Sequence, residues 1–129
     1  MKNLLLIFTL LFSSVFFSSP SYAGWTKVSE GGSSGHTFYM DFERIRKHDG
    51  FVYWWDLTDY LKPIDTEFSN KMYNQGDCKL FRVKFLSFSF HKEPMGGGTS
   101  ITHTPNNPEW NYPPPNSVWE TILKTVCNR

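Results

Sequence analysis

The chain has 129 residues, of which 18% are aromatic, and its 13 Lys and Arg nearly balance its 12 Asp and Glu, giving a formal net charge of +1. This aromatic content is too high for a disordered chain and suits a strand-rich core, and the length allows one small domain. Because phosphate contacts require an excess of basic residues, the balanced charge argues against a nucleic-acid-binding protein.

The start of the chain has the pattern of an export signal. Residues 4–17 are almost wholly apolar, and Ser21-Tyr22-Ala23 has the small-x-small pattern of a cleavage site. About 14 apolar residues are too few for a transmembrane helix, which needs roughly 20. We therefore expect a signal peptide over residues 1–23, cleavage between Ala23 and Gly24, and a mature domain over residues 24–129 without a transmembrane segment.

The chain contains two cysteines, Cys78 and Cys127. An even number of cysteines in an exported chain is typical of a disulfide, and closing the long loop between them would contribute about 4 kcal/mol on chain-entropy grounds. A metal pair or two free thiols are the alternatives, although the spacing is not that of a CxxC motif. Bacterial lipidation needs a cysteine at the cleavage site, so the chain is not expected to be a lipoprotein.

The first half of the expected domain shows three strand patterns. Strands are expected over Trp25 to Val28, His36 to Asp41 and Phe51 to Tyr60, the last entered through the turn signal Asp49-Gly50. In the third strand, every odd-numbered residue from Phe51 to Leu57 is apolar, whereas the even-numbered residues are mixed. This alternation predicts that the odd-numbered residues form the core face and that the other face is partly exposed to water.

Two further strands are expected, over Ser69 to Tyr73 and over Lys79 to His91, with a turn at Asn74 to Asp77 between them. The apolar residues of the second change parity near Phe85-Leu86, which predicts a β-bulge or a bend. Residues 94–115, rich in Gly and Pro, are expected to form a surface excursion without a helix or a central strand.

The chain ends in a predicted helix. Ser117 and Glu120 have the spacing of a capping box. An apolar stripe follows at positions i, i+3, i+4 and i+7, made of Trp119, Ile122, Leu123 and Val126. Cys127 lies beside this stripe, so a disulfide would tie the last helical turn to the start of the long strand.

No constellation has the spacing of a catalytic or metal site. Gly96-Gly97-Gly98 lacks the strand, loop and helix context of a phosphate-binding loop. The four His residues are scattered, and Asp56 and Asp59 lie three positions apart on a strand and therefore point to opposite faces. We expect no enzyme activity, no catalytic or metal-binding residues and no cofactor.

Two features are candidates for a binding surface. The first is the basic run of Arg44, Arg46, Lys47 and His48, which suits an acidic or sulfated partner or, alternatively, is a solvated loop. The second is the Pro-rich loop that carries Trp110 and Tyr112, which offers a rigid aromatic contact surface unless these two rings fold back onto the sheet.

Specific stretches resemble the surface-adhesin protein E family of Gram-negative bacteria, over essentially the whole expected mature chain. They are Gly24-Trp25-Thr26-Lys27-Val28, Phe38-Tyr39-Met40-Asp41 with Ile45 and Asp49-Gly50, Trp55-Asp56-Leu57-Thr58-Asp59-Tyr60, Ser69 with Lys71 and Tyr73, Asp77-Cys78, Pro94-Met95-Gly96-Gly97-Gly98, and Pro115-Asn116-Ser117 before a helix ending at Cys127. The resemblance implies an α+β fold, in which a compact antiparallel sheet of about six strands carries one C-terminal helix tied to it by a disulfide.

The resemblance implies a non-catalytic adhesin with host extracellular-matrix proteins such as vitronectin and laminin as partners, and it suggests self-association as a homodimer. The lipid anchor of the name-giving adhesin does not carry over, because this chain lacks the required cysteine. A periplasmic or envelope protein with a structural or small-ligand-binding role is therefore the alternative to a cell-surface or secreted adhesin.

Overall fold

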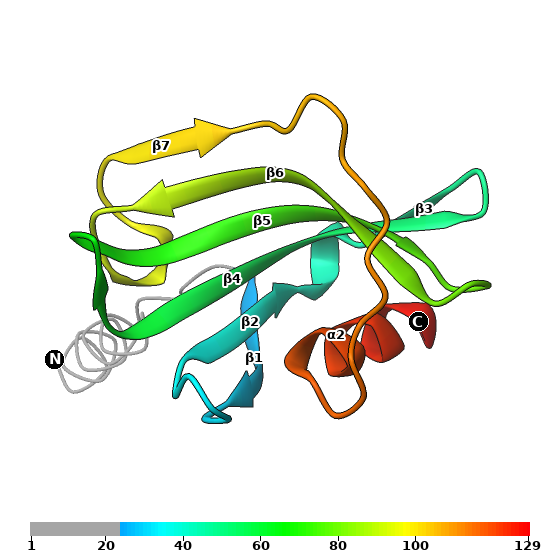
Figure 1. The fold of residues 1–129 in the computed structure, drawn as a ribbon, viewed down its shortest axis with the longest axis horizontal. Helices are drawn as coiled ribbons and strands as arrows, with labels where there is room; N and C mark the ends of the chain where they lie inside the picture. Colours follow the sequence, from blue (N-terminus) through cyan, green and yellow to red (C-terminus); the bar gives the residue numbers. More distant parts are fainter. Residues whose placement is uncertain (1–23) are drawn as a thin grey trace, which may run out of the picture.

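A computed structural model describes residues 24–129, which form one antiparallel sheet with a helix against it (Figure 1). The expected signal peptide over residues 1–23 lies outside the described residues. The strands are β1 (Trp25–Glu30), β2 (Thr37–Asp41), β3 (Arg46–His48), β4 (Phe51–Ile64), β5 (Glu67–Asp77), β6 (Arg82–His91) and β7 (Ser100–His103), and the helices are the 3-10 turns η2 (Phe42–Arg44) and η3 (Pro94–Gly96) and the α-helix α2 (Val118–Cys127).

The sheet order is β1-β2-β4-β5-β6-β7, with the short β3 paired to β4 as a seventh strand. All the strand pairs are antiparallel, and the long strands β4, β5 and β6 form a meander through the middle of the sheet. This architecture confirms the expected α+β fold class. The surface excursion expected over residues 94–115 has no central strand, because β7 lies at the edge of the sheet. It does contain the short 3-10 helix η3, where no helix was expected.

The turn expected at Asn74 to Asp77 is wrong, because these residues continue β5: residues 74–76 pair with both neighbouring strands, and Asp77 pairs with β6. Gly76 serves a close approach there: an added Cβ would lie 2.8 Å from the Trp54 ring and 2.9 Å from Leu123. The true turn follows at residues 78–81. The parity change in β6 is a bulge, as predicted, because Tyr73 and Asn74 pair with Ser87 and Phe85 and leave Leu86 out of register.

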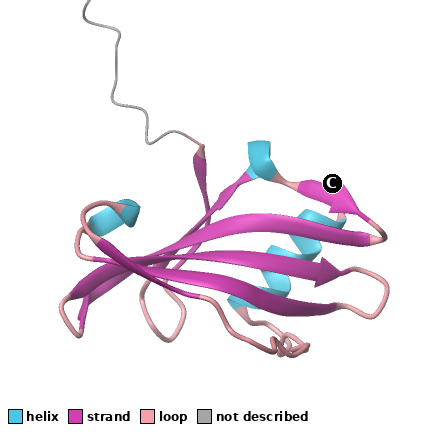
Figure 2. Ribbon diagram, turned by 90° about the horizontal axis from the view of Figure 1, so that it is seen from above, coloured by secondary structure: helices cyan, strands magenta, loops and turns pink. Residues whose placement is uncertain are grey.

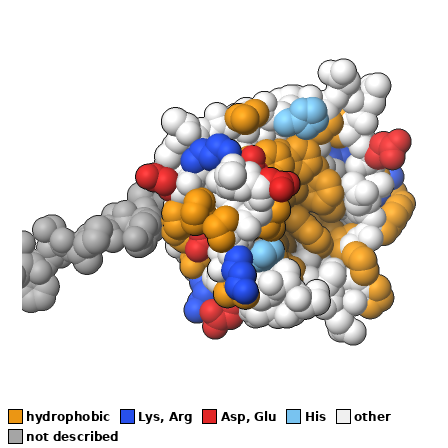
Figure 3. Space-filling model, turned by 60° about the vertical axis from the view of Figure 1, so that its left-hand side comes forward, with side chains coloured by type: hydrophobic (Ala, Val, Ile, Leu, Met, Phe, Trp, Pro, Cys, Tyr) orange, Lys and Arg blue, Asp and Glu red, His pale blue; other side chains and the backbone are white. Residues whose placement is uncertain are grey.

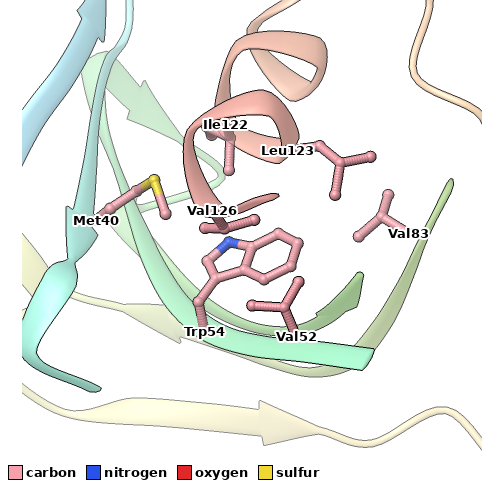
Figure 4. Packing of buried hydrophobic residues seen from close by; sticks show 7 residues of the cluster. All are labelled: Met40, Val52, Trp54, Val83, Ile122, Leu123 and Val126. Atoms are coloured by element: carbon pink, nitrogen blue, oxygen red, sulfur yellow. The ribbon is translucent and has the colours of Figure 1, made fainter. Parts of the chain in front are cut away.

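The helix α2 begins as predicted. The Ser117 hydroxyl accepts a 3.2 Å hydrogen bond from the Glu120 backbone N–H, and the helix buries Ile122, Leu123 and Val126. These three residues pack on a cluster of sheet residues that is close to fully buried (Figure 4). The sheet contributes Met40, Val52, Trp54 and Val83.

The disulfide between Cys78 and Cys127 is present and joins the last residue of α2 to the turn between β5 and β6. The helix therefore begins at a local hydrogen-bonded cap, and its last residue is covalently linked to the turn between β5 and β6. Among residues 24–129, no helix is long and apolar enough to cross a membrane.

The core face of β4 is the opposite of the one predicted. The even-numbered residues Val52 and Trp54 are buried under α2, whereas the odd-numbered Phe51, Tyr53 and Trp55 are only half-buried. The even face tolerates a polar residue because the buried Asp56 carboxylate accepts a hydrogen bond from the Trp54 indole at 3.1 Å. The alternation itself is as predicted, and only the side on which the helix packs differs.

Candidate binding surface

The sheet face opposite α2, here called the open face, carries the odd-numbered residues of β4 and β5. In Figure 2 the strands lie in front of α2, which covers the other face of the sheet. The segment around η3 closes one end of the open face: the Gly96 N–H donates to the Ser69 hydroxyl at 2.8 Å, and the Met95 N–H donates to the Asp59 carboxylate at 2.9 Å. This contact explains why Leu57, an odd-numbered residue, is fully buried.

A row of three aromatic side chains crosses the middle of the open face. Trp55 and Tyr73 are direct cross-strand partners, and their ring centroids lie 4.9 Å apart. The Tyr53 ring continues the row at 6.2 Å from Tyr73. All three side chains are half-buried, so their upper surfaces remain accessible although their edges pack against one another.

Cationic side chains stand beside this row. Two adjoining hollows share Arg44 and Trp55: one of about 130 Å³ also meets Arg46 and Tyr73, and one of about 150 Å³ also meets Trp25 and Lys71. No Asp or Glu is among the residues that line either hollow. The six lining residues define the cation–aromatic surface: Trp25, Arg44, Arg46, Trp55, Lys71 and Tyr73.

Local structure places these cations. The Asp41 carboxylate caps η2 by accepting from the Glu43 N–H at 3.2 Å, and it also lies 3.4 Å from the Arg44 Nε. Arg46 pairs with Tyr53 across β3 and β4, which puts its side chain on the open face. Within residues 24–129, neither Arg46 nor Lys71 has a carboxylate partner within 4.0 Å. Their charges are therefore available to a ligand.

Trp110 folds back over the far end of the open face. Its ring lies 5.6 Å from the Phe51 ring, with the Arg82 guanidinium 4.3 Å and the Lys84 ammonium 4.6 Å from its centroid. Two backbone hydrogen bonds between Val83 and Asn111, at 2.8 and 2.9 Å, hold the loop in place. Tyr112, by contrast, is 65% exposed.

The basic run of residues 44–48, predicted as one candidate binding surface, is divided between the two faces of the sheet by the alternation of strand side chains. Arg44 and Arg46 line the hollows, and His48 pairs with Phe51 and contacts Asp49 at 3.1 Å. Lys47 lies on the other side of the strand, where its ammonium donates to the Arg129 carbonyl at 2.9 Å beside the disulfide.

Four residues of the surface were absent from the sequence-based candidates: Trp25, Trp55, Lys71 and Tyr73. For Trp55 the available signal is the apolar odd-numbered set from Phe51 to Leu57, which the alternation predicts to be a core face. An aromatic strand face has the same pattern whether a helix or a binding partner covers it.

Figure 3 shows hydrophobic side chains gathered beside single residues of both charge signs. Across residues 24–129, no group of three or more His, Cys, Asp and Glu could hold a metal ion. Each of the two hollows on the open face is lined by two cations and two Trp or Tyr rings, whereas a hollow of about 230 Å³ beside the disulfide has one cation, Lys47, and one ring, Phe51.

The chain belongs to the Surface-adhesin protein E family, whose family model matches residues 25–128. Its fold is similar to crystal form II of Haemophilus influenzae protein E, with a TM-score of 0.63, 15% identity, and coverage of 85% of this chain and 94% of that chain. Protein E from non-typeable Haemophilus influenzae is similar with a TM-score of 0.60, 14% identity, and coverage of 86% and 79%. No curated protein matches the chain by sequence.

Proposed function

We propose that this chain is an exported, non-catalytic binding domain that contacts a host extracellular-matrix protein, such as vitronectin or laminin, through its cation–aromatic surface. Membership in a surface-adhesin family implies export and host partners. In this proposal, residues 1–23 are a signal peptide that is cleaved between Ala23 and Gly24, and residues 24–129 are the binding domain.

One observation carries the proposal: the open face combines accessible Trp and Tyr rings with Arg46 and Lys71, two cations that have no carboxylate partner among residues 24–129. Trp, Tyr and Arg are the residues that contribute most to binding at protein interfaces. Hollows of about 130 and 150 Å³ are small compared with the roughly 300 Å³ of a typical small-ligand pocket. This shape favours a partner that lies across the surface over an enclosed small molecule.

The test is a titration of the purified exported protein against immobilised vitronectin and laminin, at low and at physiological salt. Saturable binding that persists at physiological salt is expected, and Arg46→Ala should weaken it by about tenfold because the variant removes a charged contact. Lys124→Ala is the matched control, since it also removes one positive charge but lies on α2. Absence of binding, or equal binding by both variants, would contradict the proposal.

The cell location needs its own experiment. Surface labelling of intact cells should reach the protein if it contacts host matrix. Exclusive release by osmotic shock would instead favour the periplasmic or envelope role.

The homodimer also stays a prediction. All four residues of the edge strand β7 are exposed, so β7 is free to pair with the same strand of a second copy. Sedimentation of the exported protein tests this pairing.

A further inference from the structure

We infer that the cation–aromatic surface recognises a sulfated polysaccharide, a chain of sugar rings that bears sulfate groups. The inference deepens the proposed function, on which it rests for the location of the binding surface. It assigns the ligand chemistry from the charge and shape of the six residues Trp25, Arg44, Arg46, Trp55, Lys71 and Tyr73.

The cations form an elongated array along the strands. Lys71 lies on β5, and Gln75 lies four residues further along the same strand. At the Gln75 level, Gln75 pairs with Tyr53 on one side and with Lys84 on the other, and Tyr53 pairs in turn with Arg46. Since alternate residues of a strand share one face at about 6.8 Å spacing, Lys71 and the Gln75 level are about 14 Å apart. A rod-like polyanion can therefore contact several cations in succession.

The nearby carboxylates Asp41 and Asp77 do not oppose this charge complementarity, because both are buried and already paired with an Arg. Asp41 is buried and lies 3.4 Å from Arg44. Asp77 is buried and holds Arg82 at 2.9 Å. Neither carboxylate lines a hollow, so a bound sulfate would meet cations without a repelling neighbour.

The aromatic row suits sugar rings. Trp55, Tyr73 and Tyr53 pack against one another with centroid distances of 4.9 and 6.2 Å, so no slot opens between them into which a nucleic-acid base could insert. Their upper surfaces form a platform against which the C–H groups of a sugar ring can pack. The planar guanidiniums of Arg44 and Arg46 match the oxygen geometry of a sulfate group.

An extended peptide fits this surface less well. Peptides that add to a sheet need the unpaired backbone groups of an edge strand. The surface lies over β4 and β5, which are central strands with a neighbour on each side. Only side chains are available to a ligand here, and sulfated sugars are bound by side chains of these two kinds.

The experiment is a titration of the purified exported protein with size-defined heparin fragments over a range of salt concentrations. Arg46→Ala and Lys71→Gln should each weaken heparin binding by about tenfold and lower the slope of log Kd against log salt by about one. Lys124→Ala and Lys79→Gln, which remove exposed charges elsewhere, should leave both quantities within twofold of the wild type. Thermal unfolding of each variant shows whether it is folded.

Chemically desulfated heparin and a single-stranded oligonucleotide complete the test. Both should bind at least tenfold more weakly than heparin. The inference is overturned if either binds as tightly as heparin, or if the two pairs of variants behave alike.

The proposed function can fail separately. Heparin binding without binding of vitronectin or laminin would contradict the matrix-protein partner while keeping the ligand chemistry. Matrix-protein binding that depends on Arg46 but is unaffected by excess heparin would keep the proposed function and overturn the inference.

Discussion

The carboxylate of Asp56 accepts a 2.7 Å hydrogen bond from the side-chain amide of Asn74, inside the sheet face that α2 covers. Burial of this carboxyl raises its pKa to about 7, although the hydrogen bonds from Trp54 and Asn74 act in the opposite direction. A titrating group therefore lies next to the indole at the centre of the core.

Stability should fall as the pH rises from about 4 to about 7. The folded state binds the Asp56 proton more tightly than the unfolded chain, whose pKa is 3.8, so this contribution is present at low pH and is lost as the pH rises through the folded pKa. The slope from this one group reaches about 1.4 kcal/mol per pH unit. Denaturant unfolding at pH 5 and pH 8 measures it.

Asp56→Asn is the variant that isolates this effect. Its neutral amide keeps an acceptor for the Trp54 indole and the Asn74 amide, so it should be more stable than the wild type at pH 8, by at least about 1 kcal/mol. His91 titrates in the opposite sense, because burial and the nearby Lys71 charge lower its pKa, and it is common to both proteins. An unchanged pH dependence in the variant would contradict the assignment.

Replacing both cysteines by serine should lower the free energy of unfolding by about 4 kcal/mol, on chain-entropy grounds. The physical reason is that the Cys78–Cys127 link restricts the unfolded chain and holds the end of α2 on the sheet. Denaturant unfolding of the double variant measures the loss. Reduced wild-type protein is the control and should unfold at a similar denaturant concentration, whereas an unchanged midpoint would show that the link does not stabilise the fold.

Gly76→Ala should destabilise the protein by about 1–3 kcal/mol through overpacking. The added methyl would lie 2.8 Å from Trp54 Cζ3 and 2.9 Å from both Leu123 Cδ1 and Val52 Cγ1. In a Leu123→Ala background, which vacates part of this space, the same substitution should cost less. A double-mutant cycle measures the coupling, and strictly additive losses would argue against the close contact.

Trp110→Ala should lower stability by about 1–2 kcal/mol, because it removes the ring under Arg82 and Lys84 and its contact with Phe51. Tyr112→Ala is the matched control, since this residue lies in the same loop but is 65% exposed and should change stability by less than about 0.5 kcal/mol. Thermal unfolding compares the two. Equal effects would mean that the Trp110 packing does not stabilise the loop.

Local signals in the sequence were sufficient for the elements whose physics is local. The capping box at Ser117, the change of parity at Phe85-Leu86 and the turn signal Asp49-Gly50 each predicted a feature that the structure contains. The pairing of the two cysteines followed from their number and from the expected export. These signals depend on neighbouring residues along the chain or on covalent chemistry, so they can be recognised in the amino-acid sequence without knowledge of the tertiary structure.

Tertiary structure decided which face of β4 became the core. Because successive side chains of a strand point to opposite faces, Tyr53 and Trp55 share one face of β4 and Trp54 lies on the other. Both faces are apolar enough to be buried. The helix packs where Gly76 lets it approach and where Val83 completes the contact, and that arrangement depends on residues far apart in sequence. The same long-range choice left the aromatic row open and brought Arg46 and Lys71, from separate strands, to its edge. The sequence by itself therefore determined these local features and the covalent link, whereas helix packing decided which surface is left to bind a partner.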